Sequence, residues 1–211
     1  GKTLQIAASG ASVVALDRSA QRLKRLHENL ARTDLKAEVV AVPAEDWEDD
    51  RTFDILRAEA FVAAFADTMR RAPETLGPNI RANMELASSI TLADRAWAHL
   101  EQTRIMRQLA DAFSRYDLVI APVVPVTPFP WTELYADQVD GQKMRNYYHW
   151  LGLTYSITLA TNPALALPCG TDEHGMPFGL QVLGPLFGDG KLMAAANAIE
   201  HGIHTTFQDR Q

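Results

Sequence analysis

The sequence predicts an α/β protein, in which a partial mixed sheet flanked by helices follows a separate strand–helix–strand fragment. Short apolar runs rich in β-branched residues alternate with longer segments whose apolar residues recur every three or four positions. With 211 residues, of which 47% are hydrophobic and 22% charged, the chain is long enough to bury a sizeable core. An acidic, turn-prone stretch around Trp47 divides it, so we expect domains over 1–45 and 54–211 and a junction over 46–53.

The first domain is predicted to contain one βαβ unit. Residues 12–16 and 37–42 are short apolar runs typical of buried strands. Between them, Ser19 can cap a helix whose leucines, over 23–30, are spaced by three and four positions. A strand, a helix and a strand within so few residues form a crossover between two parallel strands.

The second domain is predicted to begin with helices and to continue with strands. Helical periodicity starts at Ile55 and is interrupted by Pro73 and by Gly77-Pro78. Thr91 and Asp94 have the spacing of a capping box, and the helix that they open can extend to Tyr116. The remaining elements, in order, are a strand over 117–122, a proline-rich loop, a helix over 143–160, strands over 163–168 and 178–184, and a closing helix over 189–202.

Composition excludes several classes of function. The formal net charge of −6 argues against a nucleic-acid-binding surface, which requires a basic face. No run of eighteen apolar residues indicates a membrane span, and residues 1–30 lack a signal-peptide pattern. The single cysteine, Cys169, excludes an internal disulfide framework, and no metal site is expected. We therefore expect a cytoplasmic protein, and the start at Gly1 without a methionine indicates a chain that begins mid-protein.

Asp17 is the candidate ligand-binding residue of the first domain. Gly1-Lys2-Thr3 could end a phosphate-binding loop, although the glycines that would precede it cannot be checked. An acidic residue at the end of a strand suits a Rossmann-like sheet better, because there a carboxylate accepts hydrogen bonds from ribose hydroxyls. A solvated aspartate after a strand is the alternative.

Residues 1–42 resemble the S-adenosylmethionine-binding region of ribosomal RNA cytosine-5 methyltransferases. The resemblance rests on "GKTLQIAASGASVVALDRSAQRLKRLHENLARTDLKAEVVA" and assigns Asp17 to the ribose. Pro43 stands where the family has an adenine-binding aspartate, and "ILRAEA" stands where its catalytic loop should follow. The resemblance therefore implies a vestigial S-adenosylmethionine site and no methyl transfer.

Residues 54–203 resemble the C-terminal portion of amidase-signature enzymes. The motifs are "ILRAEAF", "PETLGPNIRANMELASSITLADRAWA", "YDLVIAPVVPVTPFPW", "TYSITLATNPALALPCG" and "GMPFGLQVLGP", in the family's order and spacing. The resemblance implies hydrolysis of the C–N bond of a small-molecule amide. In this family a lysine acts through one serine to activate a second, nucleophilic serine.

No catalytic residue is expected in this chain. None of its five lysines lies in a glycine- and serine-rich loop. Its one pair of consecutive serines, Ser88-Ser89, lacks flanking glycines and is interpreted as a solvated helix end. The resemblance places the Ser–Ser–Lys triad in the family's N-terminal half.

Candidate substrate-binding residues follow from the same resemblance. Tyr148, Trp150, Tyr155 and Asn162 lie where the family segment approaches the acyl pocket, although aromatic residues at helical spacing are more often part of a core. In the subunit that amidates misacylated transfer RNA, an acidic substrate-binding residue is expected here. Trp150-Leu151 offers none, which argues against that branch.

The sequence thus predicts a fragment of an amidase-signature hydrolase that is inactive alone. One alternative is a remnant of an S-adenosylmethionine-dependent methyltransferase. Another is a non-enzymatic interaction module that self-associates through unpaired sheet edges.

Overall fold

The computed structural model describes residues 14–17, 20–34, 36, 38–41, 48–171 and 175–208. It divides into two compact units, Gly1–Trp47 and Glu48–Gln211. The expected helix end over 3–8 and the expected turn at Ser9-Gly10 lie outside the described residues.

The first unit contains the βαβ arrangement that the apolar runs predict. Strand β1 (Val14–Asp17) is followed by helix α2 (Ala20–Thr33) and strand β2 (Glu38–Ala41). The two strands pair in parallel, with Val14 opposite Glu38 and Asp17 opposite Ala41. Asp17 therefore ends β1 at the carboxyl edge of the pair, as predicted.

Four helical elements open the second unit: α3 (Glu48–Arg71), the short 3₁₀ helix η2 (Pro73–Thr75), α4 (Pro78–Ser89) and α5 (Leu92–Phe113). The Thr91–Asp94 capping box is confirmed, since the Asp94 amide donates to the Thr91 hydroxyl and the Thr91 amide to the Asp94 carboxylate. Helix α5 ends at Phe113, three residues before the predicted Tyr116.

Helix α3 begins at Glu48, so residues 48–53, which the sequence analysis assigned to a junction, form its first turns. The acidic side chains there are compatible with a helix start, because carboxylates are stabilised near a helix N-terminus. Ser88 and Ser89 confirm their structural interpretation, because both hydroxyls donate to carbonyls of the preceding turn at the end of α4.

The second half contains β3 (Val119–Pro122), the hairpin of β4 (Gln138–Val139) and β5 (Gln142–Lys143), the 3₁₀ helix η3 (His149–Leu151), α6 (Gly152–Ala160), β6 (Ala164–Thr171), β7 (Pro177–Leu183) and α7 (Asp189–Gln208). The sheet has the order β3–β7–β6, and both pairings are antiparallel. The prediction of a mixed sheet is therefore wrong for these three strands. For the β6–β7 pair, the short link explains the antiparallel arrangement, because a parallel pair needs a longer crossover.

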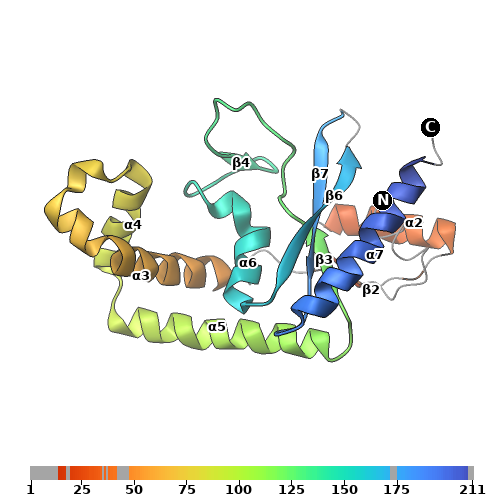
Figure 1. Ribbon diagram of the computed structural model, residues 1–211, viewed down its shortest axis with the longest axis horizontal. Helices are drawn as coiled ribbons and strands as arrows, with labels where there is room; N and C mark the ends of the chain where they lie inside the picture. The colour runs from red at the N-terminus through yellow and green to blue at the C-terminus, as the bar shows by residue number, and fades with distance from the viewer. Residues whose placement is uncertain are drawn as a thin grey trace. The chain divides into compact units, whose positions relative to one another are not determined.

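Two hydrophobic clusters hold the second unit together. Helix α7 covers one face of the sheet (Figure 1), where Leu192 and Ala196 pack against Leu167 and Val182. Helices α3, α5 and α6 share a second cluster, built on Ile105, Leu159 and Ala160. Residues along a strand alternate between faces, so Gln181, next to Val182, points away from α7.

The predicted helix over 143–160 is wrong for its first part. Lys143 belongs to the β4–β5 hairpin, whose turn residues Asp140 and Gly141 have positive φ angles of 53° and 76°. Such angles fit a type I′ turn, for which Asp-Gly is a preferred sequence. Helical structure starts only at His149, with η3.

Phe187 gives a first testable prediction. It is 97% exposed and has a φ of 60°, a conformation that strains a bulky residue. We expect Phe187→Gly to raise the free energy of unfolding by about 1 kcal/mol, measured by urea denaturation, because glycine adopts this conformation without strain. The control is Leu186→Gly, at a neighbour without a positive φ, which should lower stability. Destabilisation by both changes would contradict the prediction.

Among the described residues, no helix is long and apolar enough to cross a bilayer. In that same part of the chain, β3 and β6 form the two edges of the three-stranded sheet. Self-association through such edges stays a prediction.

Candidate functional site

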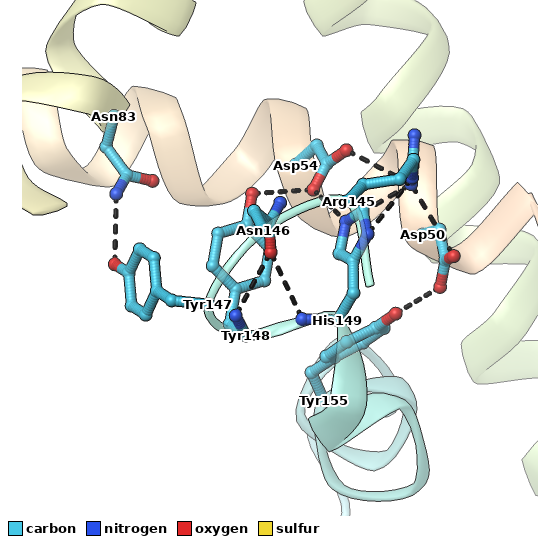
Figure 2. Close-up of polar contacts among 9 residues, drawn as sticks. All are labelled: Asp50, Asp54, Asn83, Arg145, Asn146, Tyr147, Tyr148, His149 and Tyr155. Carbon is cyan, nitrogen blue, oxygen red and sulfur yellow. Dashed lines mark hydrogen bonds and ion pairs between the residues drawn. The ribbon is translucent and has the colours of Figure 1, made fainter. Parts of the chain in front are cut away.

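Two carboxylates on one face of α3 organise a polar cluster, shown in Figure 2. Asp50 and Asp54 are four residues apart, so they lie on the same side of the helix. Asp54 accepts a hydrogen bond from the Tyr148 hydroxyl at 2.6 Å and lies 3.0 Å from His149 Nε2. Asp50 accepts from the hydroxyl of Tyr155. Side chains from α6, from η3 and from the turn that precedes η3 therefore meet the two aspartates on this face of α3.

Arg145 completes this cluster. Its Nε donates to His149 Nδ1 at 3.0 Å, and its Nη2 lies 3.1 Å from His149 Nε2, the nitrogen that also faces Asp54 at 3.0 Å. The Arg145 guanidinium also lies 3.5 Å from a carboxylate oxygen of Asp50 and 3.5 Å from one of Asp54. One cation thus bridges both aspartates.

Burial raises the pKa of both tyrosines. Loss of solvent, followed by donation to Asp54, raises the pKa of Tyr148 above its usual range. The pKa of Tyr155 is raised for the same reasons, with Asp50 as the acceptor. Both residues are only 4% exposed. Their hydroxyls therefore act as hydrogen-bond donors throughout the physiological pH range.

Tyr147 is held separately by α3 and α4. Its hydroxyl accepts from Arg57 at 2.7 Å and from Asn83 at 3.0 Å, the latter contact being visible in Figure 2. The Arg57 guanidinium lies 4.7 Å from the ring centre of Phe61 and 4.8 Å from that of Tyr148. Such cation–π contacts stabilise a half-buried arginine.

The turn after Arg145 leads into η3, which carries Trp150. Asn146 Oδ1 accepts from the backbone amides of Tyr148 at 3.0 Å and His149 at 3.1 Å, which fixes the chain as it enters η3. The Trp150 indole donates to the Tyr147 carbonyl at 3.0 Å. Its ring stands edge-on to Phe129, with centroids 5.6 Å apart.

Trp150 and Phe129 line a pocket of about 310 Å³. The proline-rich loop after β3 forms one wall, and the start of β7 forms another. The lining is apolar apart from one hydroxyl and backbone groups: Val124, Pro125, Val126, Thr127, Pro128, Phe129, Trp150, Pro177, Phe178 and Gly179. A small, largely apolar cavity of this size is suited to a small uncharged ligand.

The structure distributes the predicted substrate-binding residues over different places. Trp150 lines the pocket, whereas Tyr148 and Tyr155 are buried with their hydroxyls on α3. Asn162 does not line this pocket, and its side chain donates to the Gly184 carbonyl at 2.9 Å, which ties the start of β6 to the end of β7. Asp17 belongs to the other unit. Their roles in binding stay predictions.

Sequence reasoning missed Asp50, Asp54, Arg145 and Gln181. The spacing of the two aspartates is a signal for one helix face, but the acidic stretch was interpreted as a junction. Gln181 donates to the Pro122 carbonyl at 3.0 Å and the Leu153 carbonyl at 2.8 Å, so it joins β3 to the start of α6. In the sequence, the signal for Gln181 was its position as the one glutamine within an apolar strand.

Asp49 gives a second testable prediction. Burial raises its pKa, and the nearby Glu101 carboxylate adds to this while Arg104 opposes it. The folded state therefore binds the Asp49 proton more tightly than the unfolded state does. The contribution of Asp49 to the free energy of unfolding is present below the ordinary aspartate pKa and is lost as pH rises through the raised pKa. We expect Asp49→Asn to gain stability over the parent as pH rises, measured by urea denaturation across a pH series.

Asp94 supplies a control of opposite sign. Hydrogen bonds from Thr91 lower the pKa of Asp94. Its contribution to the free energy of unfolding is therefore present above the ordinary aspartate pKa and is lost in acid. Asp94→Asn should therefore be less stable than the parent at neutral pH, and the difference should vanish in acid. If the stability of both variants relative to the parent changed in the same direction as pH rises, the raised pKa of Asp49 would be wrong.

Comparison with known proteins identifies the family. The family model described as Amidase matches residues 2–193, so it also covers nearly all of residues 1–42, for which the sequence predicted a methyltransferase-like fragment. One subunit of a glutamyl-tRNA(Gln) amidotransferase from Clostridium acetobutylicum is 41% identical over 97 residues, covering 46% of this chain and 19% of that protein. The corresponding subunit of Agathobacter rectalis is 30% identical over 132 residues, covering 60% and 25%.

Solved structures share the fold. A crystal structure of an amidase matches this chain with a TM-score of 0.68 and 25% identity, and the match covers 90% of this chain and 45% of the amidase chain. A bacterial aryl acylamidase of the amidase signature family matches 90% and 43%, with a TM-score of 0.68 and 19% identity. The chain thus spans less than half the length of these relatives. It belongs to the amidase signature family.

Proposed function

We propose that residues 48–211 form the substrate-facing part of an amidase-signature enzyme that hydrolyses the C–N bond of a small, uncharged, aromatic carboxamide. The observation that carries this proposal is the lining of the pocket, which combines three aromatic rings with no charged side chain. A ligand with a charged group would lose its hydration there without a compensating partner. An aromatic amide can place its ring against Trp150, Phe129 and Phe178.

We propose further that this chain does not perform the bond cleavage by itself. In the family's mechanism the nucleophilic serine oxygen attacks the amide carbon, the amine leaves, and water hydrolyses the acyl-enzyme. That attack requires a lysine in a glycine- and serine-rich environment, which the sequence of this chain lacks. The triad would therefore come from the family's N-terminal half.

The test uses 4-nitroacetanilide, whose nitroaryl group quenches tryptophan fluorescence and whose hydrolysis releases coloured 4-nitroaniline. We expect 4-nitroacetanilide to quench the tryptophan fluorescence of the 211-residue chain in a saturable manner, without release of 4-nitroaniline. Phe178→Ala should weaken the binding, whereas Phe187→Ala, at an exposed phenylalanine outside the pocket, should not. Equal binding by both variants would refute the pocket assignment. Turnover that survives replacement of every serine would refute the account of the chemistry.

A second candidate is the glutaminase step of a transfer-RNA amidotransferase, because curated relatives of the chain are such subunits. Glutamine carries a charged α-amino group, for which the pocket lining offers no carboxylate, and Trp150-Leu151 offers none either. We therefore expect L-glutamine not to compete with 4-nitroacetanilide. Competition at millimolar glutamine would favour the amidotransferase.

An S-adenosylmethionine site is a further alternative, and the position of Asp17 at the carboxyl end of β1 is the observation in its favour. Pro43 in place of the expected acid predicts that S-adenosylmethionine leaves the melting temperature unchanged. A concentration-dependent rise in melting temperature, abolished by Asp17→Ala, would establish binding.

A further inference from the structure

The aromatic wall of the pocket is fixed by groups that lie outside it. Trp150 follows His149 directly in η3, and the two residues before Trp150 are both bound by Asp54 on α3. We propose that Asp54 is a positioning residue that acts through Tyr148 and His149, holds the Trp150 ring against Phe129, and so determines the affinity of the pocket for an aromatic amide. This inference rests on the proposed function of the pocket.

Asp54 has the contacts that such a role requires. Its carboxylate receives the Tyr148 hydroxyl at 2.6 Å and faces His149 Nε2 at 3.0 Å and the Arg145 guanidinium at 3.5 Å. Its side chain is 18% exposed and that of His149 only 5%. Hydrogen bonds to an ionised, half-buried acceptor are among the stronger ones in proteins. Asp54 is absent from the pocket lining, so any effect on binding must be indirect, and its partners Tyr148 and His149 directly precede Trp150 in the chain.

A second attachment limits what the loss of Asp54 can do. The Trp150 indole is tied to the Tyr147 carbonyl, and the Tyr147 hydroxyl is held by Arg57 and Asn83. Removing the Asp54 charge therefore frees one side of the turn and leaves the other attached. We expect the indole to sample more orientations while the protein stays folded.

The physical benefit is a pocket wall that is ordered before the ligand arrives. The segment before η3 has no regular structure of its own, because Asn146 rather than a helix satisfies its backbone amides. A ligand that had to order this segment would bind more weakly, since the lost conformational freedom would be subtracted from its affinity.

The experiment uses the full chain with the other three tryptophans, Trp47, Trp97 and Trp131, replaced by phenylalanine, so that emission reports Trp150 alone. Asp54→Asn removes the charge while it nearly preserves the shape. We expect red-shifted Trp150 emission, increased quenching by acrylamide, and binding of 4-nitroacetanilide weakened about tenfold. The matched control is Asp67→Asn, on the same helix, which removes an exposed ion pair with Arg70 and should leave all three readouts unchanged.

Two further variants separate positioning from general stability. Ile105→Val lowers stability in the cluster between α3, α5 and α6 and should leave the Trp150 spectrum unchanged. If Asp54→Asn does not fold, Tyr148→Phe removes one donor and should shift the spectrum in the same direction by less. A folded Asp54→Asn variant with the spectrum of Asp67→Asn would overturn the role of Asp54. Absence of saturable quenching in the parent would instead overturn the pocket's proposed function, and the spectrum would still decide the role of Asp54.

Discussion

Leu192→Ala is expected to lower the free energy of unfolding by about 2–5 kcal/mol, the largest effect of any change considered for this protein. Leu192 is 3% exposed and packs, together with Ala196, against Leu167 and Val182. Its side chain also fills the space beside Gly184, where an added Cβ would lie 3.2 Å from the Leu192 Cβ. Truncation leaves a cavity between α7 and the sheet, and β7 at the centre of the sheet cannot move to close it.

Met193→Ala is the matched control for this prediction. Met193 is the next residue of α7 but is 59% exposed, so its truncation should change stability by less than about 0.5 kcal/mol. Urea denaturation followed by far-ultraviolet circular dichroism measures both variants. Similar losses for the two would show that α7 is not held on the sheet by Leu192.

Local sequence signals were sufficient for several of the regular elements. The Thr91–Asp94 spacing located the start of α5, because the reciprocal hydrogen bonds of a capping box depend only on residues three apart. The apolar runs near 14 and 39 located two strands and, with the helix between them, their parallel pairing. Such signals require no knowledge of distant contacts.

The segment before Trp150 could not be predicted in the same way. Residues 143–148 have apolar and aromatic side chains at helical spacing, yet Asn146 bonds the backbone amides locally, and Tyr147 and Tyr148 bond to α3 and α4. Tertiary hydrogen bonds to residues between 64 and 94 positions away overrode the local preference. The Asp140-Gly141 turn was, by contrast, a local signal that could have been recognised.

The candidate site, likewise, could be predicted from the sequence only in part. The resemblance drew attention to Tyr148, Trp150 and Tyr155, and the structure places Trp150 in the pocket and the hydroxyls of the two tyrosines on α3. The partners Asp50 and Asp54 remained hidden because an acidic stretch is equally typical of a solvated linker. Only the fold shows that this face of α3 is covered by the turn that precedes η3.

Gln181→Leu is the second change with a large expected effect. The Gln181 side chain is 5% exposed and donates to the carbonyls of Pro122 and Leu153. Its replacement leaves two carbonyls without their donor, so we expect a loss of about 2 kcal/mol in the free energy of unfolding. Gln108→Leu, on the exposed face of α5, is the control and should change stability by less than about 0.5 kcal/mol.

The same substitution should also weaken ligand binding. Pro122 ends β3, from which the proline-rich wall of the pocket departs, and Leu153 lies three residues after the lining residue Trp150. Gln181 therefore joins the segments on either side, which carry that wall and Trp150, to β7, and we expect the distance between these segments to be less fixed without it. Under conditions where the variant is fully folded, 4-nitroacetanilide should bind Gln181→Leu more weakly than Gln108→Leu. Equal affinity would mean that the walls are held together by apolar packing alone, and Gln181 would then contribute only to stability.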